Sequence, residues 1–403
     1  MRDIESRRAV ESLRSGVPSA AAVRALGCGQ TRLEETFRAM LGGGSDRSGL
    51  VVRGGFGEGK SHLLTCLDRV ALDEGFASSR VVISKEIPLS DPAKLLAAAA
   101  ENLRSGSDLA RGLGEIKDRL LARVNSPEFV DFKLELERGG RFDSRFPATV
   151  TLLEESSLGD ELHDRILRFW SGDKLAVGDI RRPLRELGLA ASYPLIPIKA
   201  KDLAIQKLTF IPELLQAAGL KGWVLLLDEV ELIGRYTRLA RTRAYAELAR
   251  LLGDVAGLIT VAAVTSDFAA EVLDRRGDRD TIPAFASERY PELAVPAREG
   301  MELIDGAVLL ETPDQAALQA TYATLRRLHG DAYAWSPSDV TWPPVTGATP
   351  MRSYVRAWIN AWDVRRLDPG SRADEAGYDI SQPTTDYGES AELETTEPDD
   401  QTD

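Results

Sequence analysis

Two hydrophobic periods alternate along this chain, and their alternation predicts its fold class. Apolar residues three and four positions apart, which predict amphipathic helices, fill most of the sequence. Between them lie short, nearly continuous apolar runs that are typical of strands buried on both faces. These runs cover residues 50–53, 80–84, 222–227, 258–264 and 308–310. Strands that alternate with helices in this way predict an α/β fold with a parallel sheet.

Changes in this pattern divide the chain of 403 residues into six predicted segments, enough for two or three domain-sized units. In chain order they are N-terminal helices (1–45), the first part of an α/β core (46–94), a mainly helical insertion (95–215), the second part of the core (216–312), a helical lid (313–367) and an acidic tail (368–403). Within the insertion, residues 147–153 are a candidate exception to the helical pattern. The tail is rich in Asp, Glu, Ser, Thr and Pro, so we expect it to be disordered.

The charge and the cysteine content narrow the class of protein without naming a partner. The net charge is −13, but twelve acidic residues and one basic residue lie between Asp368 and Asp403, so the remainder is nearly neutral. No apolar run approaches the ~18–20 residues that span a bilayer, and the N-terminus lacks an apolar signal region, so we expect a protein that is neither exported nor membrane-bound. Cys28 and Cys66 lack the spacing of a zinc site. We expect them to stay unpaired in a reducing cytoplasm, a disulfide being the less favoured alternative.

The strongest chemical signal is a complete phosphate-binding loop. Residues 54–61 fit the pattern G-x-x-x-x-G-K-[ST] and lie between an apolar run and a helical stretch, as this motif requires. Lys60 is expected to reach the β- and γ-phosphates, and Ser61 to ligate Mg²⁺. A glycine-rich turn with a chance Lys-Ser is the alternative, which leaves the matching context unexplained. The residues expected to bind ATP are Gly54, Gly55, Phe56, Gly57, Glu58, Gly59, Lys60, Ser61 and His62.

A second element follows the apolar run at 224–227, where Asp228 and Glu229 end a predicted buried strand. Asp228 can hold Mg²⁺ through its water shell, and Glu229 can orient and activate a water that attacks the γ-phosphate. The alternative is a strand that simply ends on a polar turn. The pair also argues against a small-molecule kinase, which has no use for a hydrolytic water. Glu231 is expected to be a surface or helix-capping acid.

Thr265, with Ser266 as its alternate, ends the next predicted strand. The phosphate-binding loop and the Asp228-Glu229 pair are the two Walker elements of the predicted site. A polar group at this point would lie between them and contact the γ-phosphate or the attacking water. The alternative is a hydroxyl that only satisfies local backbone groups.

The order of these elements resembles an AAA+ ATPase of the Orc-like initiator group. In that family a sensor-1 polar residue corresponds to Thr265, and a sensor-2 arginine at the start of a lid helix corresponds to Arg352 within residues 349–356. The stretch 286–290 resembles the arginine-finger region, so Arg289 would act on a neighbouring subunit. The resemblance leaves three competitors for this finger, namely Arg275, Arg276 and Arg279.

A narrower resemblance is to the BREX-system P-loop ATPases of the BrxC/BrxD group, the BrxD-like members in particular. It is carried by residues 7–18, by the Gly-Phe-Gly-Glu-Gly-Lys-Ser loop and by residues 225–231. The family implies a role in bacterial defence against phage, alongside a modification methyltransferase and other system proteins.

One departure concerns DNA. Orc-like initiators usually follow the lid with a winged helix, but after Leu367 only the acidic tail remains. Any DNA contact would then come from the core, the insertion or partner proteins. The best candidate patch in the core, which a solvated or inter-subunit helix face explains equally well, comprises Arg235, Arg238, Arg241, Arg243 and Arg250. Trp358 and Trp362, one helical turn apart, are expected to form the packing face of the lid helix.

These observations predict a P-loop NTPase with an AAA+-like parallel sheet core, a large helical insertion and a C-terminal helical lid. Its expected function is that of a cytoplasmic, Mg²⁺-dependent ATPase that acts as a switch in a phage-defence complex, on or near DNA, and that can form a homo-oligomer. Two alternatives remain open: an ATP-bound scaffold with little turnover that recruits partners, and a DNA-loading or transposition-type AAA+ regulator. The Asp228-Glu229 pair favours the enzyme over the scaffold.

Overall fold

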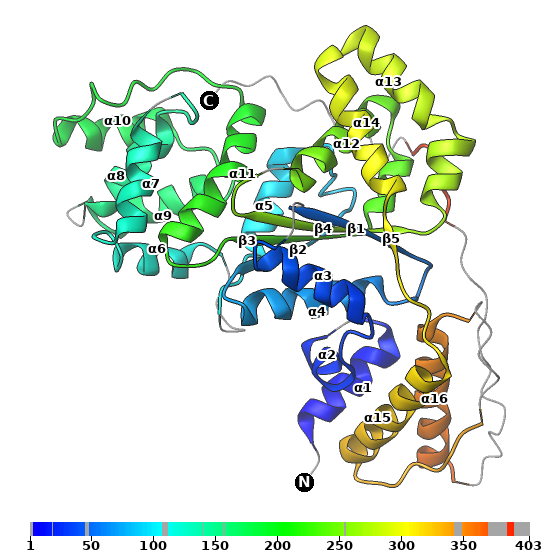
Figure 1. The fold of residues 1–403 in the computed structure, drawn as a ribbon. Coiled ribbons are helices and arrows are strands. Elements are labelled where there is room, and N and C mark those ends of the chain that lie inside the picture. The colour runs from blue at the N-terminus through cyan, green and yellow to red at the C-terminus, as the bar shows by residue number, and fades with distance from the viewer. Residues whose placement is uncertain are drawn as a thin grey trace.

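The computed structural model is built on a five-stranded, all-parallel sheet flanked by helices (Figure 1). It describes residues 3–17, 19–44, 48–106, 112–138, 140–155, 158–253, 255–341, 349–369 and 385–390. The strands are β1 (Gly49–Gly54), β2 (Ala77–Val82), β3 (Trp223–Asp228), β4 (Leu258–Thr265) and β5 (Val308–Leu309). They lie in the order β2-β3-β4-β1-β5. The α/β class with a parallel sheet, predicted from the hydrophobic pattern, is confirmed.

The register of the sheet brings the ends of three strands to one edge. Gly54 of β1 pairs with Thr265 of β4, and Asp228 of β3 pairs with Val82 of β2. Since β4 lies between β1 and β3, Thr265 ends the strand between the two Walker elements. The carboxyl edge of an open parallel sheet is where such folds bind ligands.

Helices cover both faces of the sheet. On one face lie α3 (Thr31–Leu41) and α4 (Lys60–Asp73), and on the other lie α5 (Pro92–Glu101), α11 (Ala200–Ala217) and α12 (Arg238–Leu252) (Figure 1). Successive residues of a strand belong to opposite cores: Leu226 packs on the α4 side, and Leu225 and Leu227 pack on the other. Because both of its faces are buried, β3 is apolar up to its last residue, Asp228, instead of alternating.

The insertion is helical over all its described elements. It contains α6 (Gly114–Leu121), α7 (Pro127–Glu137), α8 (Arg145–Glu154), α9 (Asp160–Trp170) and α10 (Val177–Glu186), and α11 leads back to the sheet. The exception expected at residues 147–153 is wrong, because these residues lie in α8. Their β-branched side chains lower helix propensity by only a fraction of a kcal/mol. Burial beside an aromatic cluster, in which Phe146 meets Phe210 and Phe169, outweighs that cost.

The N-terminal helices pack with the lid. Helices α1 (Ile4–Ser15) and α2 (Ala20–Leu26) lie beside α15 (Gln315–Tyr333) and α16 (Met351–Leu367), below the sheet in Figure 1. Val10 of α1 shares one apolar cluster with Trp358 and Trp362, which are fully buried. The tryptophan pair is therefore a packing face, as the sequence predicted. The start of the chain and its lid form one layer over the carboxyl edge of the sheet.

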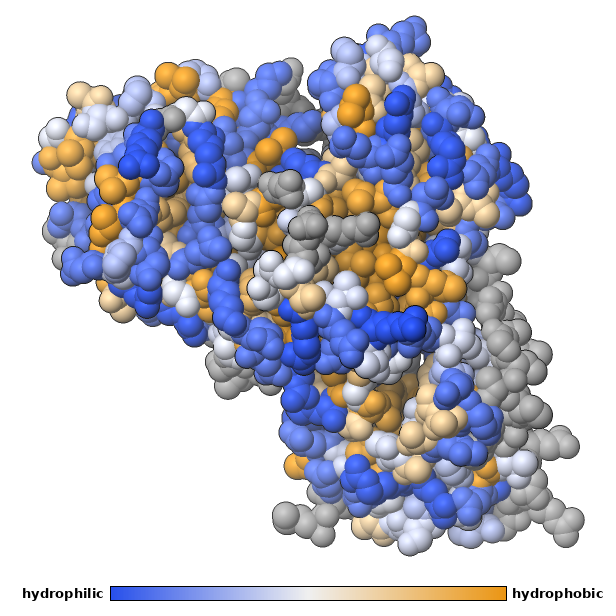
Figure 2. Space-filling model, in the orientation of Figure 1, coloured by the Kyte–Doolittle hydropathy of each residue, from blue (hydrophilic) through white to orange (hydrophobic). Residues whose placement is uncertain are grey.

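The stretch between β3 and β5 forms a helical group for which the hydrophobic pattern predicted only α12. It also contains the 3₁₀ helix η2 (Val230–Arg235), the π-helix η3 (Ala269–Arg275), α13 (Asp278–Arg289) and α14 (Pro291–Asp305). Edge strand β5 exposes Val308 and Leu309, and Figure 2 shows a hydrophobic area where Figure 1 places β5. Among the described residues, no helix combines the length and the hydropathy needed to cross a membrane.

Part of the acidic tail is folded onto the core. Residues 385–390, red in Figure 1, pack against η2 and η3, and the ring of Tyr387 is buried in the main core. The expectation of a disordered tail is therefore wrong for this segment, because an aromatic ring and an acidic side chain find partners there. The other residues beyond Pro369 lie outside the described ranges.

Candidate functional site

The phosphate-binding loop joins β1 to α4 with the geometry that its glycines allow. Gly57 and Gly59 have φ of 81° and 110°, values that residues with a side chain rarely adopt. The Nζ atom of Lys60 donates to the carbonyl oxygens of Gly54 and Gly55, at 2.9 and 3.3 Å. Helix α4 begins at Lys60, so its first backbone N–H groups face the loop. This arrangement suits the binding of phosphate oxygens.

One N–H of the loop already has an anionic partner within the chain. The backbone N–H of Gly55 donates to a carboxylate oxygen of Glu58 at 2.6 Å. A phosphate oxygen at this position would compete with Glu58, because a backbone N–H has only one proton to donate. Glu58 was predicted to bind ATP with the rest of the loop, which stays a prediction; in the structure its carboxylate accepts from the loop's own backbone.

The predicted metal ligands, Ser61 and Asp228, are oxygen donors of the kind that Mg²⁺ prefers. Asp228 is buried, and one of its carboxylate oxygens accepts from the guanidinium of Arg80 at 2.6 Å. Arg80 also donates to the Thr65 hydroxyl at 2.7 Å. The donor set thus fits Mg²⁺, but Arg80 neutralises the carboxylate that would hold the ion's water shell. Arg80 was not predicted as a site residue, although a charged residue inside a buried strand was a usable signal.

Two glutamates follow Asp228, and both line the same cavity. Glu229 has φ of 61°, a strained value for a residue with a side chain, and it is exposed to that cavity. Burial and the Asp228 carboxylate raise its pKa, while Lys60 and Arg352 act against this rise. Strain of this kind at the end of a buried strand is common at functional sites.

Glu231 is not the surface acid that the sequence suggested. It is only 7% exposed, because η2 turns the chain back toward the phosphate-binding loop. Burial raises its pKa to about 7, and Lys60 acts in the opposite direction. One of its carboxylate oxygens has no hydrogen-bond partner among the described residues. The sequence signal was a third acid two positions after Glu229.

A cavity of about 210 Å³ lies between the phosphate-binding loop, the N-terminal helices and the lid. One part of its wall is charged, with Lys60, Glu229 and Arg352. The remainder is largely apolar and comes from α1, α2 and the lid, as Leu13, Val17, Leu26, Pro313 and Val355. A charged wall beside an apolar one matches a nucleotide, which carries phosphates at one end and a flat base at the other.

Arg352 connects the lid to the phosphate-binding loop through both its backbone and its side chain. Its backbone N–H donates to the carbonyl of Gly57 at 3.2 Å, and its guanidinium lies 4.9 Å from the centre of the Phe56 ring. It also donates to the carbonyl of Gly16 at 3.4 Å. Burial and Arg356 lower its pKa, and Glu229 raises it. Arg352 thus lines the same cavity as Lys60 and Glu229, and its sensor-2 role stays a prediction.

Thr265 is buried, and it does not lie among the residues that line this cavity. Its hydroxyl is 2.6 Å from the hydroxyl of Tyr387, in the folded part of the tail. Ser266, the alternate, is exposed. No sequence signal linked Tyr387 to Thr265, since 122 positions separate them.

The arginine-finger candidates lie away from the cavity. Arg289 is exposed at the end of α13, where its guanidinium lies 5.6 Å from the centre of the Phe285 ring. Arg275 pairs with Glu271, Arg276 donates to the carbonyl of Gly234, and Arg279 pairs with Asp274 and Asp305. A role in a neighbouring subunit stays a prediction for Arg289.

The DNA patch proposed for residues 235–250 is wrong as a continuous surface. Arg241 is 3% exposed and pairs with Asp278 at 2.8 Å and with Glu389 at 2.6 Å. Arg250 pairs with Glu247. The amphipathic pattern could not reveal that the middle of this stretch pairs with the buried Asp278 and with Glu389 of the tail.

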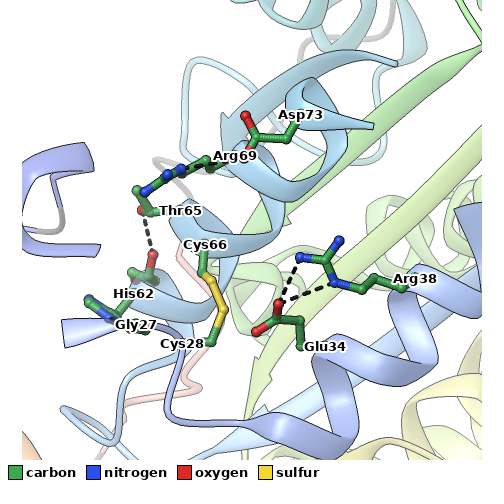
Figure 3. The surroundings of a disulfide bond; sticks show 10 residues. Gly27, Cys28, Glu34, Arg38, His62, Thr65, Cys66, Arg69 and Asp73 are labelled. Atoms are coloured by element: carbon green, nitrogen blue, oxygen red, sulfur yellow. Dashed lines mark hydrogen bonds and ion pairs between the residues drawn. A yellow bond between two sulfur atoms is a disulfide. The ribbon is translucent and has the colours of Figure 1, made fainter. Parts of the chain in front are cut away.

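A disulfide between Cys28 and Cys66 lies next to the cavity, so the expectation of unpaired cysteines is wrong (Figure 3). Their Cα atoms are 5.6 Å apart, within the range for such a bond. Cys66 belongs to α4, and Cys28 lies in the turn after α2, which lines the cavity. Because the two cysteines are paired, they do not indicate a reducing compartment.

Two hydrogen-bonded contacts hold the same turn. The Nε2 atom of His62 lies 2.7 Å from the carbonyl oxygen of Gly27, and burial lowers the pKa of this histidine. The side chain of Gln30 exchanges two hydrogen bonds with the backbone of Glu311, at 2.9 and 2.8 Å. His62, predicted to bind the nucleotide, therefore lines the cavity and also positions the turn that closes it.

A protein family matches the N-terminal part of the chain. Residues 1–144 match the family described as BREX system ATP-binding protein BrxC/D. The match includes the phosphate-binding loop and ends before Asp228, and it supports placing the chain in the BrxC/D group, with an ATP-binding role in a BREX system. No curated protein and no solved structure matches the chain.

Proposed function

We propose that this chain, whose first 144 residues match the BREX system ATP-binding protein BrxC/D family, hydrolyses ATP as an AAA+-like switch. One observation carries the proposal. A single cavity collects Lys60 from the phosphate-binding loop, Glu229 from the end of β3 and Arg352 from the lid. ATP binding alone would require only the phosphate-binding loop. A carboxylate and an arginine that come from two other segments suit a reaction at the γ-phosphate.

The proposed chemistry gives each residue a separate role. Lys60 and the N–H groups at the start of α4 hold the phosphates, and displacement of Glu58 frees the N–H of Gly55. Bound Mg²⁺, held through Ser61 and Asp228, would supply positive charge to the phosphates. Glu229 accepts a proton from the attacking water, because its position and raised pKa suit a general base.

The lid makes the reaction a switch. Arg352 offers its guanidinium to the γ-phosphate, where negative charge develops during hydrolysis. Loss of that phosphate removes its main anionic partner and leaves the carbonyl and ring contacts and the attraction of Glu229. Since α16 packs with α1 and α15, the nucleotide state reaches the whole layer of N-terminal and lid helices.

The cellular role is proposed from the family. The chain would work in the cytoplasm within a BREX phage-defence complex, with the methyltransferase and other system proteins, on or near DNA. In a homo-oligomer, the exposed Arg289 would act as the arginine finger in the active site of a neighbouring subunit. The burial of Arg241 moves the expected DNA contact to the insertion or to partner proteins.

The decisive experiment measures phosphate release by the wild-type chain and by Glu229→Gln and Lys60→Ala. We expect Glu229→Gln to bind ATP with turnover reduced by at least about a hundredfold, since general bases typically contribute 10²–10⁴-fold. Lys60→Ala should lose both ATP binding and turnover. Equal turnover by wild type and Glu229→Gln would sink the catalytic assignment. Repeating the assay with duplex DNA at two salt concentrations, alongside particle sizing, tests direct DNA contact and assembly.

A scaffold with little turnover is the second candidate, and one observation favours it. The hydroxyl of Thr265, the proposed sensor, is engaged by Tyr387 instead of facing the cavity. The scaffold predicts ATP binding with no difference between wild type and Glu229→Gln in phosphate release.

A further inference from the structure

The folded segment of the tail fills a specific groove on the core. Its centre is Tyr387, which is 8% exposed, and its ring centre lies 5.7 Å from that of Phe268 in a T-shaped pair. Gly234 forms the opposite wall, where an added Cβ would lie 2.5 Å from the tyrosine ring. A larger residue at position 234 would therefore close the groove. An aromatic ring of this size gains most of its binding free energy from such burial.

Two polar contacts fix the residues that follow. The carboxylate of Glu389 accepts from Arg241 at 2.6 Å, and Arg241 is itself almost fully buried. The backbone N–H of Ser390 donates to the carbonyl of Arg235 at 3.1 Å. The groove formed by Gly234, Phe268 and Arg241 thus binds a tyrosine and an acidic residue two positions after it. We propose that it is a binding site for acidic, tyrosine-containing peptide, and that its occupant is residues 385–390 of the same chain.

The hydroxyl groups at the base of the groove have a defined direction. Tyr387 donates its only proton to the carboxylate of Asp267 at 2.9 Å, because an ionised carboxylate can only accept. The 2.6 Å contact between Tyr387 and Thr265 must then use the proton of Thr265. Burial raises the pKa of Tyr387, so its hydroxyl stays protonated near neutral pH.

The occupied groove therefore withholds the only proton that Thr265 can donate. A sensor hydroxyl that donates to a γ-phosphate oxygen needs that proton. The docked segment restrains hydrolysis, and its displacement by a partner that takes the groove releases Thr265. This regulation rests on the proposed ATPase function, whereas the docking of the segment does not. The segment follows lid helix α16 in the chain, so lid and groove are covalently linked.

Hydrogen exchange of the full-length chain tests the docking independently of turnover. The N–H of Ser390, which donates to the core, should exchange slowly in the wild type and in Tyr387→Phe, which keeps the ring, and rapidly in Tyr387→Ala. Rapid exchange of this N–H in the wild type would overturn the docking. Protection that disappears on dilution would assign the groove to the tail of a second copy and overturn the intrachain occupant.

Turnover tests the restraint. Tyr387→Phe leaves the segment docked but frees the proton of Thr265, so turnover should rise about two- to tenfold, the net effect of one hydrogen bond. The same change in a Thr265→Val chain should give no rise, because the two effects share one hydroxyl. An unchanged or lower turnover in Tyr387→Phe, or an equal rise in the Thr265→Val chain, would refute the restraint. Absence of turnover in all variants would overturn the proposed ATPase and the restraint, while exchange still decides the docking.

Discussion

Breaking the disulfide between Cys28 and Cys66 should weaken the core that holds the phosphate-binding loop. The bond closes a loop of 38 residues, which includes α3, β1 and the loop itself. In the chain-entropy description, a cross-link over this length removes unfolded-state entropy worth about 4 kcal/mol at 25 °C. Measured effects commonly reach 2–4 kcal/mol, so we expect Cys66→Ser to lose about that much unfolding free energy.

The change also reaches the cavity, because Cys28 lies in its wall. The turn keeps its contacts to His62 and Glu311, which limits its displacement. We therefore expect ATP to bind less than about tenfold more weakly, a change of under ~1.4 kcal/mol. The loss of stability should exceed the loss of ATP affinity.

Urea unfolding without nucleotide, followed by tryptophan fluorescence, measures the first effect, since Trp223 is fully buried in β3, an interior strand of the sheet. Reductant should lower the midpoint for the wild type to that of Cys66→Ser, and Cys28→Ser should match Cys66→Ser with or without reductant. Two free thiols in the oxidised, denatured wild-type chain would refute the reasoning at its start. An equal effect of reductant on Cys66→Ser would show that the disulfide is not its target.

Three further changes test other features. Burial raises the pKa of Glu231 to about 7, so the folded state binds its proton more tightly, and stability should fall by up to about 3 kcal/mol as pH rises from ~4.5 to ~7. Glu231→Gln should flatten that part of an unfolding-versus-pH curve, and an unchanged slope would exclude Glu231 as the source. Arg80→Met removes the partner of Asp228 and should cost about 3 kcal/mol in denaturant unfolding, with Arg69→Met, on the exposed side of α4, as a near-neutral control. Gly300→Ala places a Cβ against the backbone of Tyr245, so its melting temperature should fall by an amount equivalent to about 1–3 kcal/mol, whereas Gly114→Ala meets open space and should not lower it.

Much of the fold and of the site could be predicted because the signals are local. The apolar runs of β1, β3 and β4 identify buried strands, since a strand covered on both faces has no polar side to hide its pattern. The phosphate-binding loop needs glycines at positive φ followed by Lys-Ser, a requirement that lies within eight consecutive residues. Asp228 and Glu229 could be located because they directly follow such a strand.

The failures share one cause, which is that the partner lies far away in sequence. Glu231 looked like a surface acid because nothing nearby shows that η2 turns it under the loop. Arg241 looked like part of a basic face, but its partners Asp278 and Glu389 come from α13 and the tail. The exception to the helical pattern expected at residues 147–153 failed because packing in an aromatic core overrode a weak local preference.

By itself, the sequence predicted an α/β core with a P-loop for a triphosphate and an Asp-Glu pair at the end of a buried strand. Tertiary structure decided which side chains share the cavity, why Asp228 is paired with Arg80, and where the acidic tail goes. The physical reason is that motifs encode backbone conformation and residue chemistry within a few positions. Burial and charge pairing instead depend on residues brought together by folding, such as Thr265 and Tyr387, which no local pattern connects.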